Sequence, residues 1–243
     1  LPGNPWAAES ARVARDLELC ELTGARLHIQ HLSTRQALER VREAKKRGVN
    51  VTCEVCCHHL TLTDESLRSF DAVYKVAPPL RTQADCDALL GGLLDGTVDC
   101  LATDHAPHTL EEKAKPYPAS PSGMTGVQTL VPIMLDHVNA GRLTLERFVD
   151  LTSHGPNRLF GIAGKGRIAA GYDADLTIVD MKRTQTIRNS WIESRVGWTP
   201  YDGMNVTGWP VGTIIRGRRV MWEGQLVTAS QGEAIRFAET LGG

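Results

Sequence analysis

The 243-residue sequence lacks a surplus of charge, because 27 basic residues stand against 28 acidic ones. It has no cluster of lysines and arginines with interleaved aromatics, so nothing in it predicts nucleic-acid binding. No apolar run reaches the roughly 18 residues of a membrane span. No basic segment followed by an apolar one opens the chain, so we predict no signal peptide and a cytoplasmic location.

The cysteines lack the pairing that a closed zinc site needs. Such a site usually combines one Cys-x-x-Cys with a second ligand pair, and no second pair is present here. A disulfide framework is an alternative because the number of cysteines is even. A chain of this length without an export signal instead favours free thiols in a reducing cytosol. The six cysteines are Cys20, Cys53, Cys56, Cys57, Cys86 and Cys100.

What the sequence does contain is an alternation of strands and helices. Strands are predicted at residues 25–31, 49–55 and 97–103. Helices are predicted from Pro5, with Asn4 as its cap, to Gly24; after a cap at Ser33 or Thr34, to Gly48; from Thr82; and over 127–139 and 145–152. This order favours a parallel sheet. Beyond Gly164 the pattern becomes that of glycine-punctuated antiparallel strands. We therefore predict two domain segments, 1–164 and 165–243.

The stretch VTCEVCCHHL (51–60) concentrates cysteine and histidine. On one strand, Cys53 faces the core, while Glu54 and Cys56 face the other side. A small zinc-binding interaction module is a disfavoured alternative, because this alternation separates its ligands, Cys53, Cys56, Cys57, His58 and His59. We interpret His58 and His59 as loop residues. An unpaired buried carboxylate is costly, so Glu54 is the residue here that favours a cation.

Two other stretches place polar groups where strands end. In LATDHAPHTLEEK (101–113), Asp104 follows a strand directly, and functional groups of parallel barrels lie at such ends. A carboxylate there can bind a cation and move a proton, and His108 can bind an anionic substrate group. In HIQHLS (28–33), His28 and His31 point to opposite faces. His31 is the better ligand, with a hydrogen-bonded core histidine as the alternative.

Together these segments resemble the type I dihydroorotases of the amidohydrolase superfamily. ATDHAPHTLEEK (102–113) is similar to the family signature small-[ST]-D-x-A-P-H-x4-K. HIQHLST, VTCEVCCHHLTLT, KVAPPLR (75–81) and SGMTGVQTLVP (122–132) resemble further family stretches in the same order. GRIAAGYDADLTIVD (166–180) resembles the small β-sandwich lobe. The resemblance implies an α/β fold: the C-terminal part of a metal-dependent-hydrolase TIM barrel plus this lobe.

The resemblance also implies a reaction and a set of site residues. The reaction is the reversible hydrolysis of dihydroorotate to N-carbamoyl-L-aspartate in pyrimidine biosynthesis, with one or two Zn²⁺ ions. By position, His31 and Asp104 would bind zinc, Asp104 would also be the general acid/base, and Glu54 would touch an additional ion. The substrate contacts would be His108, Ser122, Gly123 and, at a position where the family usually has Asn, Ala77. A homodimer and aspartate transcarbamoylase are the partners that the resemblance implies.

Several family features are missing from the chain. The H-x-H-x-R of the first barrel strand and the lysine that becomes carboxylated are absent, and we expect both in an upstream part. We therefore expect the chain alone to be inactive. Gln30 stands where relatives with an extra zinc have Cys, and Cys57 replaces a Pro. The alternatives are an allantoinase or hydantoinase, and a non-catalytic dihydroorotase-like scaffold subunit, which the retained His31, Asp104 and His108 disfavour.

Overall fold

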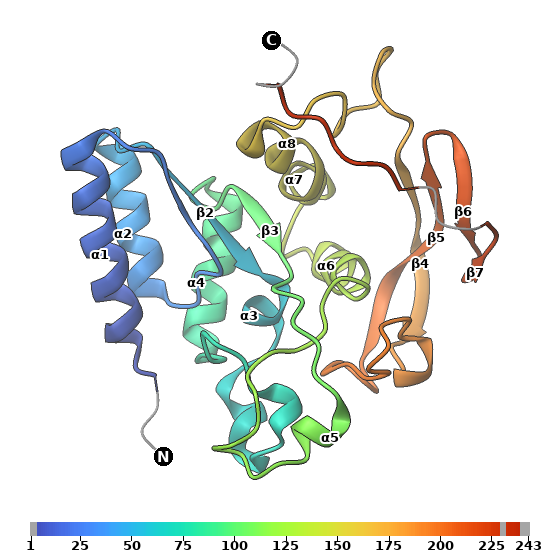
Figure 1. The fold of residues 1–243 in the computed structure, drawn as a ribbon, viewed down its shortest axis with the longest axis horizontal. Coiled ribbons are helices and arrows are strands. Elements are labelled where there is room, and N and C mark those ends of the chain that lie inside the picture. Colours follow the sequence, from blue (N-terminus) through green and yellow to red (C-terminus); the bar gives the residue numbers. More distant parts are fainter. Residues whose placement is uncertain (1–3, 229–231, 239–243) are drawn as a thin grey trace. The chain divides into compact units, whose positions relative to one another are not determined.

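The computed structural model describes residues 4–228 and 232–238 (Figure 1). The chain divides into two compact units. The first comprises the residues up to Leu130 together with Ile187–Met204, and the second comprises Val131–Thr186 together with the residues from Asn205 onward. The predicted boundary near residue 164 separates two kinds of domain segment, whereas these two units are defined by packing. The units therefore do not test the boundary, which stays a prediction.

The first unit contains a parallel three-stranded sheet in the order β1-β2-β3. Its strands are β1 (Leu27–Ile29), β2 (Val51–Cys56) and β3 (Cys100–Ala102). Leu27 pairs with Val51, and Glu54 pairs with Cys100. The prediction of strands joined in parallel by helices is confirmed. All three carboxyl ends therefore lie at the same edge of the sheet.

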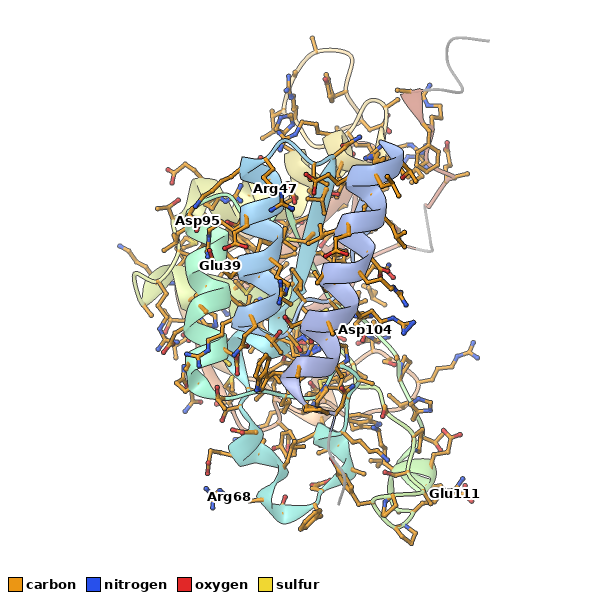
Figure 2. All side chains as sticks on the ribbon, turned by 90° about the vertical axis from the view of Figure 1, so that its left-hand side faces the viewer. Glu39, Arg47, Arg68, Asp95, Asp104 and Glu111 are labelled. Carbon is orange, nitrogen blue, oxygen red and sulfur yellow. The ribbon has the colours of Figure 1, made fainter. Side chains whose placement is uncertain are left out.

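Three helices form a layer beside this sheet (Figure 1): α1 (Trp6–Thr23), α2 (Arg35–Lys46) and α4 (Gln83–Leu94). The side chains of Thr34 and Thr82 cap α2 and α4, as predicted. The prediction that Asn4 caps α1 is wrong, because Pro5 itself is the extended residue before the helix. On α2, Arg42 pairs with Glu39 and with Asp95 beyond α4, and such exposed pairs contribute little stability. Figure 2 labels both acidic partners.

Short elements follow the strand ends in the same unit. They are α3 (Cys57–Thr61), the 3₁₀ turns η1 (Asp64–Ser69), η2 (Ala72–Tyr74) and η4 (Asn189–Trp191), and α5 (Leu110–Lys113). Two fully buried aromatic residues hold them. Trp198 Nε1 donates to the carbonyl of His108 at 2.7 Å, and Tyr201 lies 3.6 Å from the thiol of Cys57. The segment 187–204 thus packs under the loops that follow the strands.

The second unit combines short helices with an antiparallel sheet. The helices are α6 (Leu130–Asn139, which begins at the last residue of the first unit), α7 (Leu145–Val149) and α8 (Gly155–Phe160), with a π-helical turn η3 at Asp150–His154. The sheet has the order β4-β5-β6-β7. Its strands are β4 (Leu176–Thr186), β5 (Asn205–Ile215), β6 (Arg218–Trp222) and β7 (Gln225–Leu226). The predicted antiparallel character is confirmed.

Two global features bear on the sequence expectations. All six cysteines are buried free thiols. Among the described residues, no helix combines the length and the apolar character needed to cross a bilayer.

Candidate functional site

The two predicted metal ligands occupy equivalent backbone positions. His31 lies two residues beyond β1 with φ 39°, and Asp104 lies two residues beyond β3 with φ 45°. This left-handed conformation costs a non-glycine residue about 1–2 kcal/mol. Such strain persists only where the surroundings enforce it, and it concentrates at functional sites. Phe70, Arg216 and Glu223 also have a positive φ, so the conformation supports the prediction for His31 and Asp104 but is not unique to them.

Electrostatic effects indicate that the three strand ends converge. Burial above all, with smaller contributions that include repulsion from His31, lowers the pKa of His59 to about 4. Burial and neighbouring groups that include Asp104 raise the pKa of the Cys56 thiol. His31 follows β1, Cys56 ends β2 and Asp104 follows β3. The two predicted ligands thus border the same region on either side of β2.

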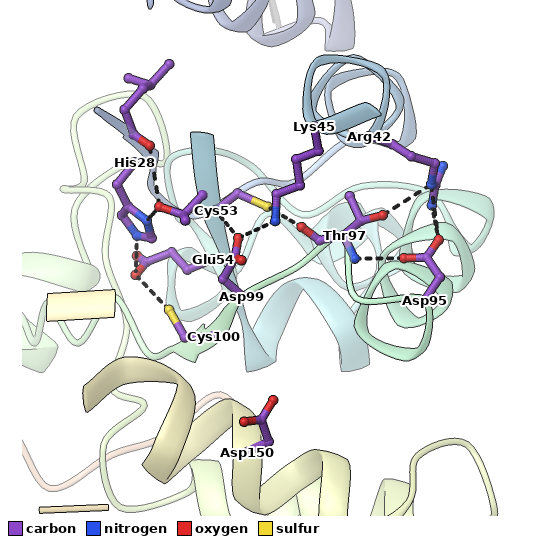
Figure 3. Close-up of polar contacts among 12 residues, drawn as sticks. His28, Arg42, Lys45, Cys53, Glu54, Asp95, Thr97, Asp99, Cys100 and Asp150 are labelled. Atoms are coloured by element: carbon purple, nitrogen blue, oxygen red, sulfur yellow. Dashed lines mark hydrogen bonds and ion pairs between the residues drawn. The ribbon is translucent and has the colours of Figure 1, made fainter. Parts of the chain in front are cut away.

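The carboxylate of Glu54 is not isolated, because other side chains of the protein contact it (Figure 3). Its Oε2 lies 3.2 Å from His28 Nε2 and 4.0 Å from Cys100 Sγ, and His28 Nδ1 lies 2.9 Å from Thr52 Oγ1. The Glu54 side chain is 14% exposed, as the prediction of an inward carboxylate implies. His28, Glu54 and Cys100 could hold an ion, but their polar atoms already satisfy one another.

The predicted substrate contacts form one local group. His108 Nε2 lies 3.1 Å from the carbonyl oxygen of Ser122, and its Nδ1 lies 3.5 Å from a carboxylate oxygen of Glu112. Gly123 donates its N–H to the carbonyl of Lys75 at 2.9 Å. The backbone of Ser122 and Gly123 is thereby fixed against His108. This contact brings residues 108 and 122 together, which the sequence separates by a loop.

Gly123 has no space for a side chain. Its φ is +135°, and a Cβ would lie 2.5 Å from the carbonyl oxygen of Ala106. We expect Gly123→Ala to lower the free energy of unfolding by about 1–3 kcal/mol. The matched control is Gly91→Ala in α4, where no heavy atom lies within 4 Å, and this change should stabilise by about 0.5–1 kcal/mol. Urea denaturation measures both, and equal effects would contradict the prediction.

Ala77 is exposed and precedes a cis bond to Pro78. A cavity of about 490 Å³ lies nearby, and its lining includes His28, Gln30, His31 and Pro78. This volume falls in the range of small-molecule sites. The lining includes neither Asp104 nor His108, so the hollow lies on the β1 side of the site and does not reach the predicted substrate contacts.

Lys113 is a positioning residue that the sequence interpretation did not single out, although it closes the A-P-H-x4-K motif. Its Nζ is buried and donates to the carbonyls of Ala72 at 2.9 Å, Lys75 at 3.3 Å and Pro121 at 3.0 Å. Lys113 thereby ties α5 to the segment before Ser122. Burial, with repulsion from Lys75, lowers the pKa of Lys113 to about 8.

This lowered pKa predicts a pH dependence of stability. Between about pH 8 and about pH 10.5 the unfolded chain keeps a proton on Lys113 that the folded chain releases, so folding becomes more favourable as the pH rises. We expect the free energy of unfolding of the wild type to rise with pH relative to Lys113→Met. Denaturant titrations on either side of this window measure the difference. The exposed Lys115→Met is the control without a slope, and a constant difference would refute the prediction.

Glu9 anchors the loop after His31 through a contact that the sequence did not predict. The carboxylate of Glu9 in α1 accepts hydrogen bonds from the backbone N–H groups of Ser33 and Thr34, both at 3.0 Å, and from both hydroxyls. Arg81 joins Glu9 at 3.4 Å and donates from Nε to Ser33 Oγ at 3.0 Å. Sequence spacing gives no signal for this contact, because Glu9 and Ser33 are 24 positions apart.

The interpretation of His58 and His59 as loop residues is wrong. Both lie in α3 and are about 1% exposed, because a helix begins directly after β2. Strand alternation does separate Cys53 from the other residues of the disfavoured zinc module, and its thiol donates to the carbonyl of Thr97. It does not apply beyond Cys56, where the strand ends.

The comparisons with known proteins agree with each other. The model of the amidohydrolase family matches residues 8–220. The chain is 52% identical over 218 residues to a dihydroorotase of Deinococcus radiodurans, covering 90% of this chain and 52% of that protein. It is 44% identical over 227 residues to a dihydroorotase of Thermus aquaticus, covering 90% and 53%. The chain spans about half the length of the curated relatives it matches.

The chain also superposes on solved structures of hydantoinases. The L-hydantoinase (dihydropyrimidinase) of Arthrobacter aurescens superposes with a TM-score of 0.88 at 34% identity, covering 92% of this chain and 51% of that one. A D-hydantoinase superposes with a TM-score of 0.87 at 32% identity, covering 91% and 50%. The predicted α/β fold, that of part of a metal-dependent-hydrolase TIM barrel, is confirmed.

Proposed function

The chain belongs to the amidohydrolase family, and from that premise we propose that it is part of a dihydroorotase, which reversibly hydrolyses dihydroorotate to N-carbamoyl-L-aspartate in pyrimidine biosynthesis. The observation that carries the proposal is the segment 102–113, where Asp104 leaves β3 in a strained conformation and His108 contacts Ser122. Identity of 52% to a protein named dihydroorotase supports it.

Zinc is the metal in this proposal. An imidazole and a carboxylate are donor types of catalytic zinc sites, so His31 after β1 and Asp104 after β3 fit as ligands. Glu54, with His28 and Cys100 beside it, could hold an additional ion, which would displace the contact between His28 and Glu54. When bound, zinc supplies Lewis-acid polarisation of the scissile carbonyl.

The residues of the chain itself supply proton transfer and orientation. The carboxylate of Asp104 takes the proton of the attacking water and returns it to the leaving ring nitrogen. His108 contacts the substrate carboxylate, and the backbone of Ser122 and Gly123 completes that contact. Lys113 and Lys75 hold this loop, because their ammonium groups bind the carbonyls of Pro121 and Ser120, which directly precede it. Ala77 would line the substrate site from the opposite loop.

A hydantoinase is the second candidate, because the solved structures named above are hydantoinases. Identities of 52% and 44% to dihydroorotases, against 32–34% to those structures, favour the first candidate. A non-catalytic scaffold subunit is disfavoured by His31, Asp104 and His108. The homodimer, the aspartate transcarbamoylase partner and the cytoplasmic location stay predictions.

Initial rates of the intact protein on dihydroorotate, hydantoin and allantoin test the proposal. We expect a kcat/KM on dihydroorotate at least tenfold above the other two. A preference for hydantoin or allantoin would replace the proposal with the second candidate. The absence of turnover on all three, in protein that is folded and zinc-loaded, would favour the scaffold.

A further inference from the structure

The end of β2 carries a cluster that the proposed function does not use. Cys56, His58 and His59 each offer one ligand atom, and these three atoms lie within 4.8 Å of one another. All three residues are buried, with Cys56 at 0% and each histidine at 1% exposure. They come from four consecutive positions, because the chain turns from strand to helix between Cys56 and Cys57. The turn brings together side chains that a continuous strand would separate.

The two imidazoles in this cluster are incompletely satisfied. Among the described residues, His58 Nε2 and His59 Nδ1 are buried without a hydrogen-bond partner. His59 Nε2 lies 3.0 Å from the carbonyl oxygen of Pro78 and therefore carries the ring proton, which leaves a lone pair on Nδ1. An unmet buried polar atom is destabilising, because it has lost its hydrogen bond to water and gained none in the fold. A ligand that accepts nitrogen lone pairs would remove this cost.

The two imidazoles lie side by side in this cluster. Their ring centroids are 4.2 Å apart and their planes are tilted by 58°. Neutral imidazole is the form that binds metal, and the lone pair left on His59 Nδ1 belongs to that form.

The geometry is close to that of a tetrahedral centre. Bonds of about 2.0 Å to nitrogen and 2.3 Å to sulfur place ligand atoms roughly 3.3–3.7 Å apart. The observed limit of 4.8 Å requires a closure of about 1 Å, which side-chain rotation at the start of a short helix can supply. Three protein donors leave the fourth position for water or another donor.

We propose that Cys56, His58 and His59 form a binding site for a thiophilic divalent cation such as Zn²⁺ or Cd²⁺, separate from the ligands His31 and Asp104. Binding releases the thiol proton of Cys56 and forms one metal–sulfur and two metal–nitrogen bonds. The mixed sulfur and nitrogen donors select such ions over Mg²⁺ and Ca²⁺, which take oxygen ligands. The site requires no substrate and no catalysis, so it stands whether or not the proposed function holds.

The test is a titration of the chelator-treated protein with Cd²⁺, followed by the ultraviolet thiolate-to-cadmium charge-transfer band. We expect the band to saturate in the wild type and to be lost in Cys56→Ser. His59→Asn should weaken cadmium binding at least about tenfold. Cys53→Ser and Cys57→Ser are matched controls, because each removes a buried thiol outside the cluster, and both should keep the band. Asp104→Asn should keep it too, which separates this site from the proposed catalytic metal.

Three results would overturn the proposal: no band in the wild type, a band unchanged in Cys56→Ser, or a band lost equally in Cys53→Ser. Circular dichroism checks that each variant is folded. If Cys56→Ser does not fold, the X-ray absorption spectrum of cadmium in the wild type decides. One sulfur and two nitrogen neighbours support the site, and a shell of oxygen and nitrogen alone refutes it.

Discussion

Asp104→Asn is expected to lower kcat of the intact protein by about 10²- to 10⁴-fold, the range of a lost general acid/base. Asparagine is nearly isosteric and tolerates the left-handed backbone that Asp104 adopts at φ 45°, so the substitution keeps the local structure. What it removes is the charge and the proton-accepting ability of the carboxylate. We therefore expect lost activity with little change in the free energy of unfolding.

Asp99 provides a matched control, because it precedes the same strand at its opposite end. Its Oδ2 accepts hydrogen bonds from Lys45 Nζ and from the N–H of Cys53, both at 2.7 Å. Residues at the amino-terminal ends of parallel barrel strands serve stability rather than catalysis. Asp99→Asn should cost about 1 kcal/mol of stability and leave kcat unchanged. Equal losses of activity in the two variants would mean that Asp104 acts only through the fold.

The comparison of Asp104 with His58 explains what the sequence could predict. Asp104 lies in a long specific motif and follows a buried strand, so local pattern predicts its position at the strand end. His58 also follows a strand, but α3 begins at once and buries it. Periodicity over a few residues does not reveal such a switch from strand to helix, because both conformations accommodate an apolar pair such as Cys56 and Cys57.

Local sequence predicts helix caps, but it does not predict contacts between segments that only the fold brings together. Thr34 and Thr82 cap their helices through their own side chains, which local sequence predicts. The partner of Glu54 was not predicted, because His28 reaches it only through the parallel pairing of β1 with β2. Lys113 binds three carbonyls from two distant segments. Contacts that depend on tertiary structure, rather than on spacing, account for the part of the site that the sequence left open.

Glu9→Ala is expected to lower the free energy of unfolding by about 3–5 kcal/mol, because the change leaves a buried positive charge and buried donors without their acceptor. The carboxylate serves the backbone and hydroxyl groups of Ser33 and Thr34, which are fully buried, and the guanidinium of Arg81, whose side chain is 10% exposed. No other described residue is placed to take over both backbone bonds. Chemical denaturation measures the loss.

The same substitution should also weaken metal binding at the candidate site. Ser33 lies two residues after His31, and the strained backbone of His31 persists only while the following loop is held. We expect Glu9→Ala to weaken zinc binding by about 10- to 100-fold, the usual effect of losing a group that orients a metal ligand. Glu18→Ala, an exposed change on the same helix, should alter stability by less than about 0.5 kcal/mol and leave zinc affinity unchanged. If Glu9→Ala destabilises the protein but zinc affinity is retained at temperatures where it is folded, the anchor serves the fold alone, and His31 is held by its own surroundings.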